Sequence, residues 1–203
     1  MKFEPFPKVP RWQRDIVITE KIDGANASVH VVHIDEIGGR YTPKDVTRDP
    51  PIVAVVNDDY AILAASRTRW LDTSSKGDSF GFAKWVRDNA DELFTLGPGS
   101  HFGEWWGQGI QRKYNQDRKR FSLFNTHRWS ENRPSCCDVV PVLYRGPLSS
   151  KVIEAVLWGL ERGGSFAAPG FMKPEGIMIY HTAANQMFKK TIEKDELPKG
   201  LAK

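Results

Sequence analysis

A short segment of the chain carries a lysine, an aspartate and a glycine at a spacing suited to covalent chemistry: Lys21, Asp23 and Gly24. Residues two apart in an extended chain point to the same face, so Lys21 and Asp23 are expected side by side, and Gly24 lets the backbone turn. A lysine amine acts as a nucleophile only when neutral, and with an ordinary pKa near 10.4 about one lysine in a thousand is neutral at pH 7.4. A nucleophilic lysine therefore needs nearby cations, either basic side chains or a divalent metal. The simpler alternative is a surface ion pair beside a hairpin turn.

Other segments rich in chemically active side chains follow at intervals along the chain. They are Ser66-Arg67 and the stretches 102–111, 121–125, 174–179 and 187–191. Together with residues 21–24, and in this order, they resemble the motifs of the covalent nucleotidyltransferases, which include ATP-dependent polynucleotide ligases and capping guanylyltransferases. The string from 102 to 111, FGEWWGQGIQ, is most similar to the nick-sealing RNA ligases. The resemblance spans about residues 18 to 191, nearly the whole chain.

The resemblance implies a set of contacts to ATP. Glu104 is expected to contact the ribose, and Phe124 to stack on the adenine while Met178 covers the second face of the base. Phe121 is expected on the opposite face of its strand from Phe124, because side chains alternate along a strand. Our hypothesis for Glu20, the neighbour of the lysine, is that it reads the edge of the adenine.

The resemblance also implies a reaction. Lys21 is expected to attack the α-phosphate of ATP and form a covalent lysyl-AMP, with Asp23 as its motif partner and Lys189 stabilising the phosphate charge. Glu175 is expected to bind Mg²⁺ or Mn²⁺, which would neutralise phosphate charge during transfer. Lys190 follows Lys189 directly, whereas the family usually separates its two lysines by one residue, so Lys189 is the predicted phosphate contact.

A third group of residues is expected to contact nucleic acid. By the same resemblance, Arg67 is expected to help hold the nucleotide and the 5′-phosphate end, and Arg69 is a second candidate for this motif arginine. Asn26 and Arg67 are assigned to the later steps, in which AMP passes to a 5′-phosphate and a 3′-hydroxyl then seals the strand. Arg112 and Lys113 begin a basic cluster after the stretch 102–111 and are predicted to neutralise phosphates, with a solvated surface as the alternative. The net charge of +4 is compatible with a polyanionic partner but does not require one.

The elements that must position these residues are mostly strands. Runs rich in β-branched and aromatic residues predict strands at 16–20, 26–34, 52–56, 61–66, 100–105, 121–125, 139–144, 176–181 and 186–189. Helical spacing of apolar residues predicts two amphipathic helices, one over about 82–93 and one over about 152–160 that begins at Ser149 or Ser150 and ends at Gly163-Gly164. Residues 35–51 have the composition of an exposed loop. The predicted fold class is α+β, a nucleotidyltransferase domain of antiparallel sheets flanked by helices.

Length and composition limit the remaining possibilities. With 203 residues, 40% of them hydrophobic, the chain is expected to form a single nucleotidyltransferase domain over 1–203, without a separate C-terminal nucleic-acid-binding domain. No apolar run approaches the roughly 20 residues that cross a bilayer, and no secretory signal is recognisable, so we expect no membrane contact and a cytoplasmic location. The expected partners are RNA, as a nicked duplex or a hybrid, and a protein that replaces the missing domain.

The sequence therefore predicts an ATP-dependent RNA ligase. An ATP-dependent DNA ligase, a capping guanylyltransferase that uses GTP, and a non-catalytic nucleic-acid-binding module of the same fold stay open as alternatives. The presence of Lys21 argues against the binding module, and the stretch 102–111 favours RNA over DNA.

Overall fold

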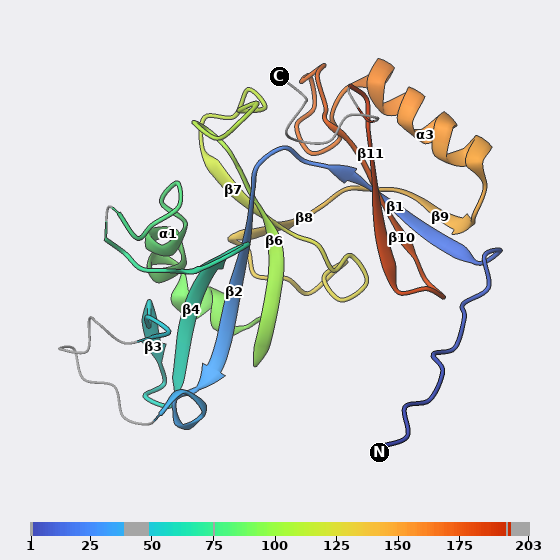
Figure 1. The fold of residues 1–203 in the computed structure, drawn as a ribbon. Helices are drawn as coiled ribbons and strands as arrows, with labels where there is room; N and C mark the ends of the chain where they lie inside the picture. The colour runs from blue at the N-terminus through green and yellow to red at the C-terminus, as the bar shows by residue number, and fades with distance from the viewer. Residues whose placement is uncertain (1, 39–48, 75, 194, 196–203) are drawn as a thin grey trace. The chain divides into compact units, whose positions relative to one another are not determined.

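The computed structural model describes residues 2–38, 49–74, 76–193 and 195 of the chain (Figure 1). Its contacts divide the chain into two compact units, Met1–Ile22 with Pro141–Lys203, and Asp23–Val140. The chain leaves the first unit between Lys21 and Asp23, inside the segment that the sequence analysis singled out, and each unit is described by itself.

The first unit is a four-stranded antiparallel sheet with one helix. The strand order is β11-β10-β1-β9, formed by β1 (Asp15–Lys21), β9 (Val142–Pro147), β10 (Gly176–His181) and β11 (Gln186–Thr191). The helix α3 (Ser150–Gly163) lies where it was predicted, and its apolar positions pack with Ile16 and Ile18 of β1 and Ile177 and Ile179 of β10. Alternation then places Val17, Thr19 and Lys21 on the other face of the sheet.

The second unit is a seven-stranded sheet with two short helices on one face. The strand order is β3-β4-β2-β6-β7-β8, with β5 paired to β4. The strands are β2 (Ala25–His33), β3 (Ala54–Val56), β4 (Tyr60–Ser66), β5 (Trp70–Leu71), β6 (Gly99–Gly107), β7 (Lys119–Leu123) and β8 (Cys137–Val139), and the 3-10 turn η1 (Ile34–Ile37) follows β2. The helices are α1 (Phe82–Asp88) and α2 (Ala90–Phe94).

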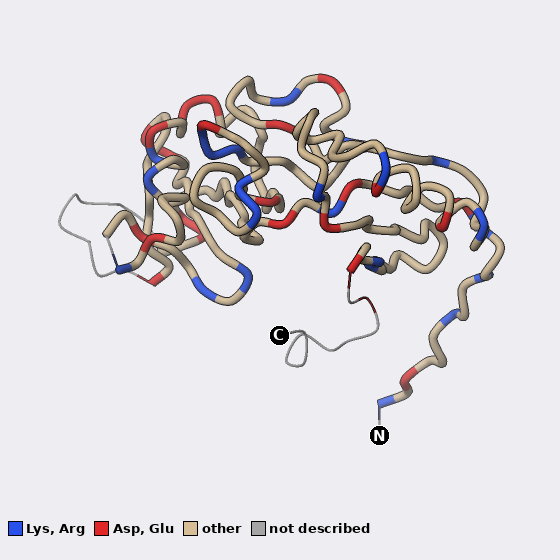
Figure 2. The backbone as a smooth tube through the Cα atoms, turned by 90° about the horizontal axis from the view of Figure 1, so that it is seen from above, with Lys and Arg blue, Asp and Glu red and all other residues tan. Residues whose placement is uncertain are grey.

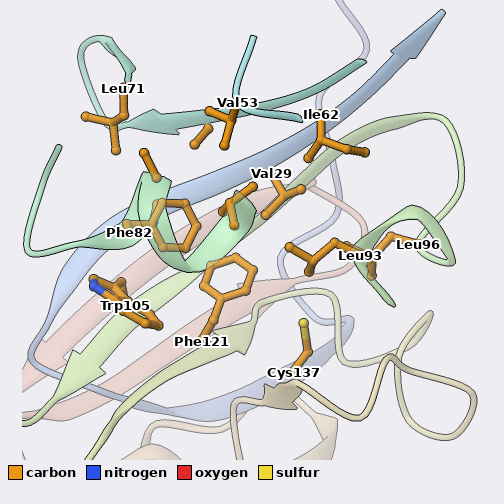
Figure 3. Close-up of a cluster of buried hydrophobic side chains, with 14 of the residues drawn as sticks. Val29, Val53, Ile62, Leu71, Phe82, Leu93, Leu96, Trp105, Phe121 and Cys137 are labelled. Carbon is orange, nitrogen blue, oxygen red and sulfur yellow. The ribbon is translucent and has the colours of Figure 1, made fainter. Parts of the chain in front are cut away.

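The core of this unit lies between the sheet and these helices (Figure 3). Side chains from β2, β4, β6 and β7 pack against Phe82 of α1 and Leu93 of α2. Trp105 and Phe121 fill the centre, and the centroid of each of these rings lies about 5 Å from that of Phe82. The opposite face of the sheet carries buried apolar side chains such as Leu63 and Trp106 as well as polar and partly exposed ones.

The predicted α+β class is confirmed, and four details of the prediction are corrected. The helix expected over 82–93 is interrupted at Asn89, whose φ of −121° is not helical. The strand expected over 139–144 is two strands in different sheets, because the chain turns at Val140 and Pro141, and proline cannot donate to a ladder. The β7–β8 pair is parallel, and the two-residue β5 was not predicted, because it is too short to show a period.

Two further expectations concern the loop 35–51 and membrane-spanning helices. Most of the loop predicted for 35–51 lies outside the described residues, apart from η1 at its start and residues 49–51 at its end. Within the described ranges, no helix has the length and apolar character needed to cross a membrane.

Candidate active-site residues

Lys21 lies at the end of β1 and contacts Glu175. Its strand partner is Gly176, the first residue of β10, so strand pairing brings the residue before β10 to the end of β1. The Lys21 Nζ donates to the Glu175 carboxylate, and both side chains are mostly buried, with 21% and 18% of their surface exposed. The predicted nucleophile and the predicted metal ligand, 154 positions apart in the chain, are therefore direct neighbours in the first unit.

The register of β10 and β11 separates the two neighbouring lysines. Met178 pairs with Thr19 on one side and with Lys189 on the other, so Met178 and Lys189 share the face of the sheet that carries Lys21. Lys190 pairs with Ile177, a core residue, and therefore lies on the face covered by α3, where its Nζ is 3.8 Å from a carboxylate oxygen of the loop after β11. Strand alternation thus places Lys189, and not Lys190, on the same face of the sheet as Lys21.

Glu20 lies on the opposite face of β1 from Lys21 and is buried. It is 1% exposed, and its carboxylate accepts hydrogen bonds from the Ser165 hydroxyl at 2.6 Å and from the backbone N–H groups of Phe166 and Ala167 at 2.8 and 2.9 Å. Burial raises the pKa of Glu20, and these hydrogen bonds oppose that rise. Alternation along β1 turns the Glu20 side chain away from Lys21, and the carboxylate anchors the loop after α3. The reading of an adenine edge by Glu20 stays a prediction.

In the second unit, Asp23 and Gly24 are held by three contacts. The Asp23 carboxylate accepts a hydrogen bond from the Arg112 Nε at 3.0 Å, and the Asp23 N–H donates to the Tyr114 hydroxyl at 2.9 Å. The Gly24 N–H donates to the Glu104 carboxylate at 3.0 Å. A Cβ at Gly24 would lie 2.5 Å from a backbone oxygen of β6, so a larger residue would force the two strands apart. These contacts fix the turn that follows the lysine.

Asn26 and Glu104 lie directly opposite each other in the register of β2 and β6, on the face of the sheet turned away from the core. Phe124 follows β7, is half-buried and donates its N–H to the Phe102 backbone oxygen of β6. Phe121 is fully buried and points into the core cluster of Figure 3.

The predicted nucleic-acid contacts have mixed positions. Arg67 lies exposed in the turn after β4, and Lys113 is exposed in the loop after β6. Arg112 is partly buried, and its guanidinium donates to the Asp23 carboxylate, so it helps to position Asp23. Its contact with nucleic-acid phosphates stays a prediction. Lysine and arginine alternate with acidic residues along the backbone instead of forming one basic block (Figure 2).

The carboxylate beside Lys21 suits a metal ion that is held mainly by the phosphate oxygens of a bound substrate. Among the described residues, no group of three or more His, Cys, Asp and Glu side chains is placed to hold a metal. Mg²⁺ usually keeps several waters and binds through one or two carboxylates together with phosphate oxygens. Glu175, a single carboxylate beside the lysine, matches this second kind of site.

The sequence analysis missed two residues that support these contacts. Tyr114 is fully buried and bonds the Asp23 backbone, and Ser165 bonds the Glu20 carboxylate. An aromatic residue next to a basic pair was the only signal for Tyr114, and nothing in the sequence pointed to Ser165, because its partner is 145 positions away.

Comparison with known proteins adds independent information. The sequence model of the family described as RNA ligase matches residues 14–192, which include parts of both units. The comparison with curated proteins found no match.

Solved structures of Naegleria gruberi RNA ligase share the fold. A variant solved with ATP and Mn has a TM-score of 0.58 at 17% identity, covering 89% of this chain and 50% of that one. A variant solved with AMP and Mn has a TM-score of 0.57 at 16% identity, covering 88% of this chain and 49% of that one. The chain thus spans about half the length of these proteins. Since the family match covers most of its residues, including the lysine, the carboxylates and the paired strands described above, the chain belongs to the RNA ligase family.

Proposed function

We propose that the protein is an ATP-dependent RNA ligase that works through a lysyl-AMP intermediate on Lys21. The observation that carries this proposal is the contact between Lys21 and Glu175, with Lys189 and Met178 on the same face of the sheet as the lysine. A lysine placed beside a single metal-binding carboxylate and a second cation is the arrangement that nucleotidyl transfer requires.

In the first step, the lone pair of the Lys21 Nζ attacks the α-phosphorus of ATP. A nitrogen–phosphorus bond forms, the bond from the α-phosphorus to the bridging oxygen breaks, and pyrophosphate leaves with the electron pair. The Lys21 ammonium must first lose a proton and leave its ion pair with Glu175. Glu175 would hold a divalent cation, Mg²⁺ or Mn²⁺, which would supply charge neutralisation on the phosphates. Lys189 stabilises the same phosphate charge.

The remaining nucleotide contacts follow the family resemblance. Glu104 contacts the ribose, and Phe124 and Met178 stack on the two faces of the adenine. The Glu104 carboxylate already accepts a hydrogen bond from Gly24, which holds it in one orientation for that contact. Asp23 is oriented by Arg112 and Tyr114, so that the chain after the lysine presents one fixed conformation.

In the later steps, an oxygen of the RNA 5′-phosphate attacks the AMP phosphorus, the nitrogen–phosphorus bond breaks, and Lys21 recovers its proton. A 3′-hydroxyl then attacks the activated 5′-phosphorus, and AMP leaves. Asn26 and Arg67 contact the RNA in these steps, with Lys113 at the exposed end of the loop after β6. A single domain over 1–203, a cytoplasmic location and a protein partner that helps to bind the RNA belong to the same proposal.

The experiment that tests the proposal is incubation with α-³²P-labelled ATP and a divalent cation, followed by denaturation. We expect label on the wild-type chain, none on Lys21→Ala, and wild-type labelling of Lys151→Ala, an exposed lysine of α3. Competition with unlabelled GTP and NAD separates a ligase from a guanylyltransferase, and matched nicks in RNA and DNA separate the two kinds of ligase. Absence of label with every nucleotide would refute the mechanism, and equal label on Lys21→Ala would refute the assigned nucleophile.

A further inference from the structure

Three aromatic rings form a partly exposed cluster on the outer face of the seven-stranded sheet. They are His30 of β2, Trp70 of β5 and Phe102 of β6, here called the aromatic cluster. The His30 ring centroid lies 4.8 Å from that of Trp70 and 6.1 Å from that of Phe102, with both pairs close to perpendicular. Phe102 is 54% exposed and Trp70 is 37% exposed. Exposed rings gathered in this way are typical of binding surfaces.

Strand pairing places the rings on one face. Ala65 of β4 pairs with both Trp70 and Ser28, and Ser28 pairs in turn with Phe102, so these four residues form one row across the sheet. His30 lies two residues beyond Ser28 on the same face. The cluster is therefore created by four strands and not by one flexible loop.

The central ring is held in a fixed orientation. The two ring nitrogens of His30 are 2.9 Å from the Ser28 hydroxyl and 2.8 Å from the Ser100 hydroxyl. Burial, reinforced by His101, lowers the pKa of His30, which keeps the imidazole neutral at pH 7. A neutral, anchored ring acts as an aromatic wall and loses little conformational entropy when a ligand binds.

The cluster continues the face that carries Asn26 and Glu104. These two residues form the next row on β2 and β6, two positions along from Ser28 and Phe102, or about 7 Å. A ligand lying along these strands would thus contact the aromatic cluster and then the residues assigned above to RNA and ribose.

Positive charge borders the cluster on the side of Trp70. Arg67 and Arg69 are exposed in the turn between β4 and β5, and the Arg69 guanidinium donates to the Trp70 and Gly77 backbone oxygens at 3.4 and 2.7 Å. Aromatic rings beside guanidinium groups suit a ligand that has both flat bases and phosphates.

We propose that the aromatic cluster stacks unpaired bases of the RNA substrate, while Arg67 and Arg69 contact the adjoining phosphates. The proposal rests on the proposed RNA ligase function. It requires unpaired bases because the bases of a duplex are stacked on one another and present no open face to a protein ring, whereas bases of a single strand stack readily on aromatic side chains.

The test compares the wild-type chain with the double variant Trp70→Leu/Phe102→Leu, which keeps apolar side chains but removes two rings. The matched control is Trp158→Leu, an exposed tryptophan of α3 that packs on an arginine of its own helix. Affinity for a 5′-phosphorylated single-stranded RNA, for a duplex of the same sequence and for the single strand with two abasic sites is measured by fluorescence anisotropy. Labelling by ATP is measured on the same preparations.

We expect the double variant to bind the single strand about tenfold or more weakly than the wild type, because stacking contributes that much for each base. Duplex affinity, labelling by ATP and the control variant should change less than twofold. Abasic sites should weaken binding to the wild type but not weaken binding to the double variant further. The variant Trp70→Phe/Phe102→Tyr should restore the affinity.

The outcomes separate this proposal from the proposed function. Loss of labelling in the wild type refutes the ligase mechanism. Normal labelling with unchanged single-strand affinity of the double variant overturns the stacking proposal, as does an equal loss of single-strand and duplex affinity. Unchanged RNA affinity with a change in self-association of the double variant also overturns it, and identifies the cluster as a contact between copies of the chain.

Discussion

Glu20 offers a quantitative test of how the first unit is held together. In Glu20→Ala, three donors lose their acceptor: the Ser165 hydroxyl and the N–H groups of Phe166 and Ala167. Each buried donor left without a partner costs about 1 kcal/mol or more, so the free energy of unfolding should fall by at least about 3 kcal/mol. For a chain of this size, that corresponds to a fall in Tm of about 6 to 12 °C.

Glu20→Gln should behave differently. The amide keeps the shape and one acceptor oxygen, and it removes the cost of a buried charge. Its stability should lie much closer to that of the wild type than to that of Glu20→Ala. Since burial raises the pKa of Glu20 above its ordinary value of 4.5, the folded wild type holds a proton at pH values where the unfolded chain has lost it. The contribution of Glu20 to stability is therefore fully present below pH 4.5 and declines as the pH rises through the folded-state pKa.

The assay is urea unfolding of the wild type, both variants and Glu161→Ala, an exposed carboxylate of α3, at several pH values from 4 to 8. The difference in unfolding free energy between wild type and Glu20→Gln should fall as the pH rises over this range. Labelling by ATP relative to GTP should be the same in Glu20→Gln and in the wild type. The anchoring role would be refuted if the free energy of unfolding fell by less than about 1 kcal/mol in Glu20→Ala and the nucleotide preference changed in Glu20→Gln. That result would support the predicted role in adenine recognition.

Four further predictions concern the two lysines of β11, Gly24, and the two phenylalanines Phe121 and Phe124. Lys189→Ala should lower the labelling rate at least tenfold and Lys190→Ala less than twofold, because the two side chains lie on opposite faces of the sheet; equal effects in the labelling assay would contradict the register. Gly24→Ala should abolish labelling, because its Cβ would lie 2.5 Å from a backbone oxygen of β6, and wild-type labelling would show that the strands separate easily. Phe121→Ala should lower the unfolding free energy by about 3 to 5 kcal/mol, as expected for a buried aromatic residue. Phe124→Ala should instead raise the KM for ATP about tenfold with a smaller loss of stability, measured by calorimetry and initial rates.

Much of the fold could be predicted because its elements show their period locally. The helix α3 and the strand β10 have the boundaries that the apolar spacing and glycines indicated, within a residue or two. The division of the stretch 139–144 and the short strand β5 could not be predicted, because each depends on pairing with other strands and not on local spacing. The break at Asn89 was hidden by apolar spacing that continues through it.

The candidate site likewise has features that the sequence predicted and features that only the tertiary structure decided. The sequence alone indicated the family, which the family model over residues 14–192 confirms, since residue types such as Lys21 and Glu175 stand in a recognisable order along the chain. Only the tertiary structure decided which side chains meet. It joined Lys21 to Glu175, placed Lys189 and not Lys190 on the face that carries Lys21, and turned Glu20 toward the loop after α3. The physical reason is that motif order is a property of the linear chain, whereas contact depends on strand register, and a shift of one residue moves a side chain to the opposite face.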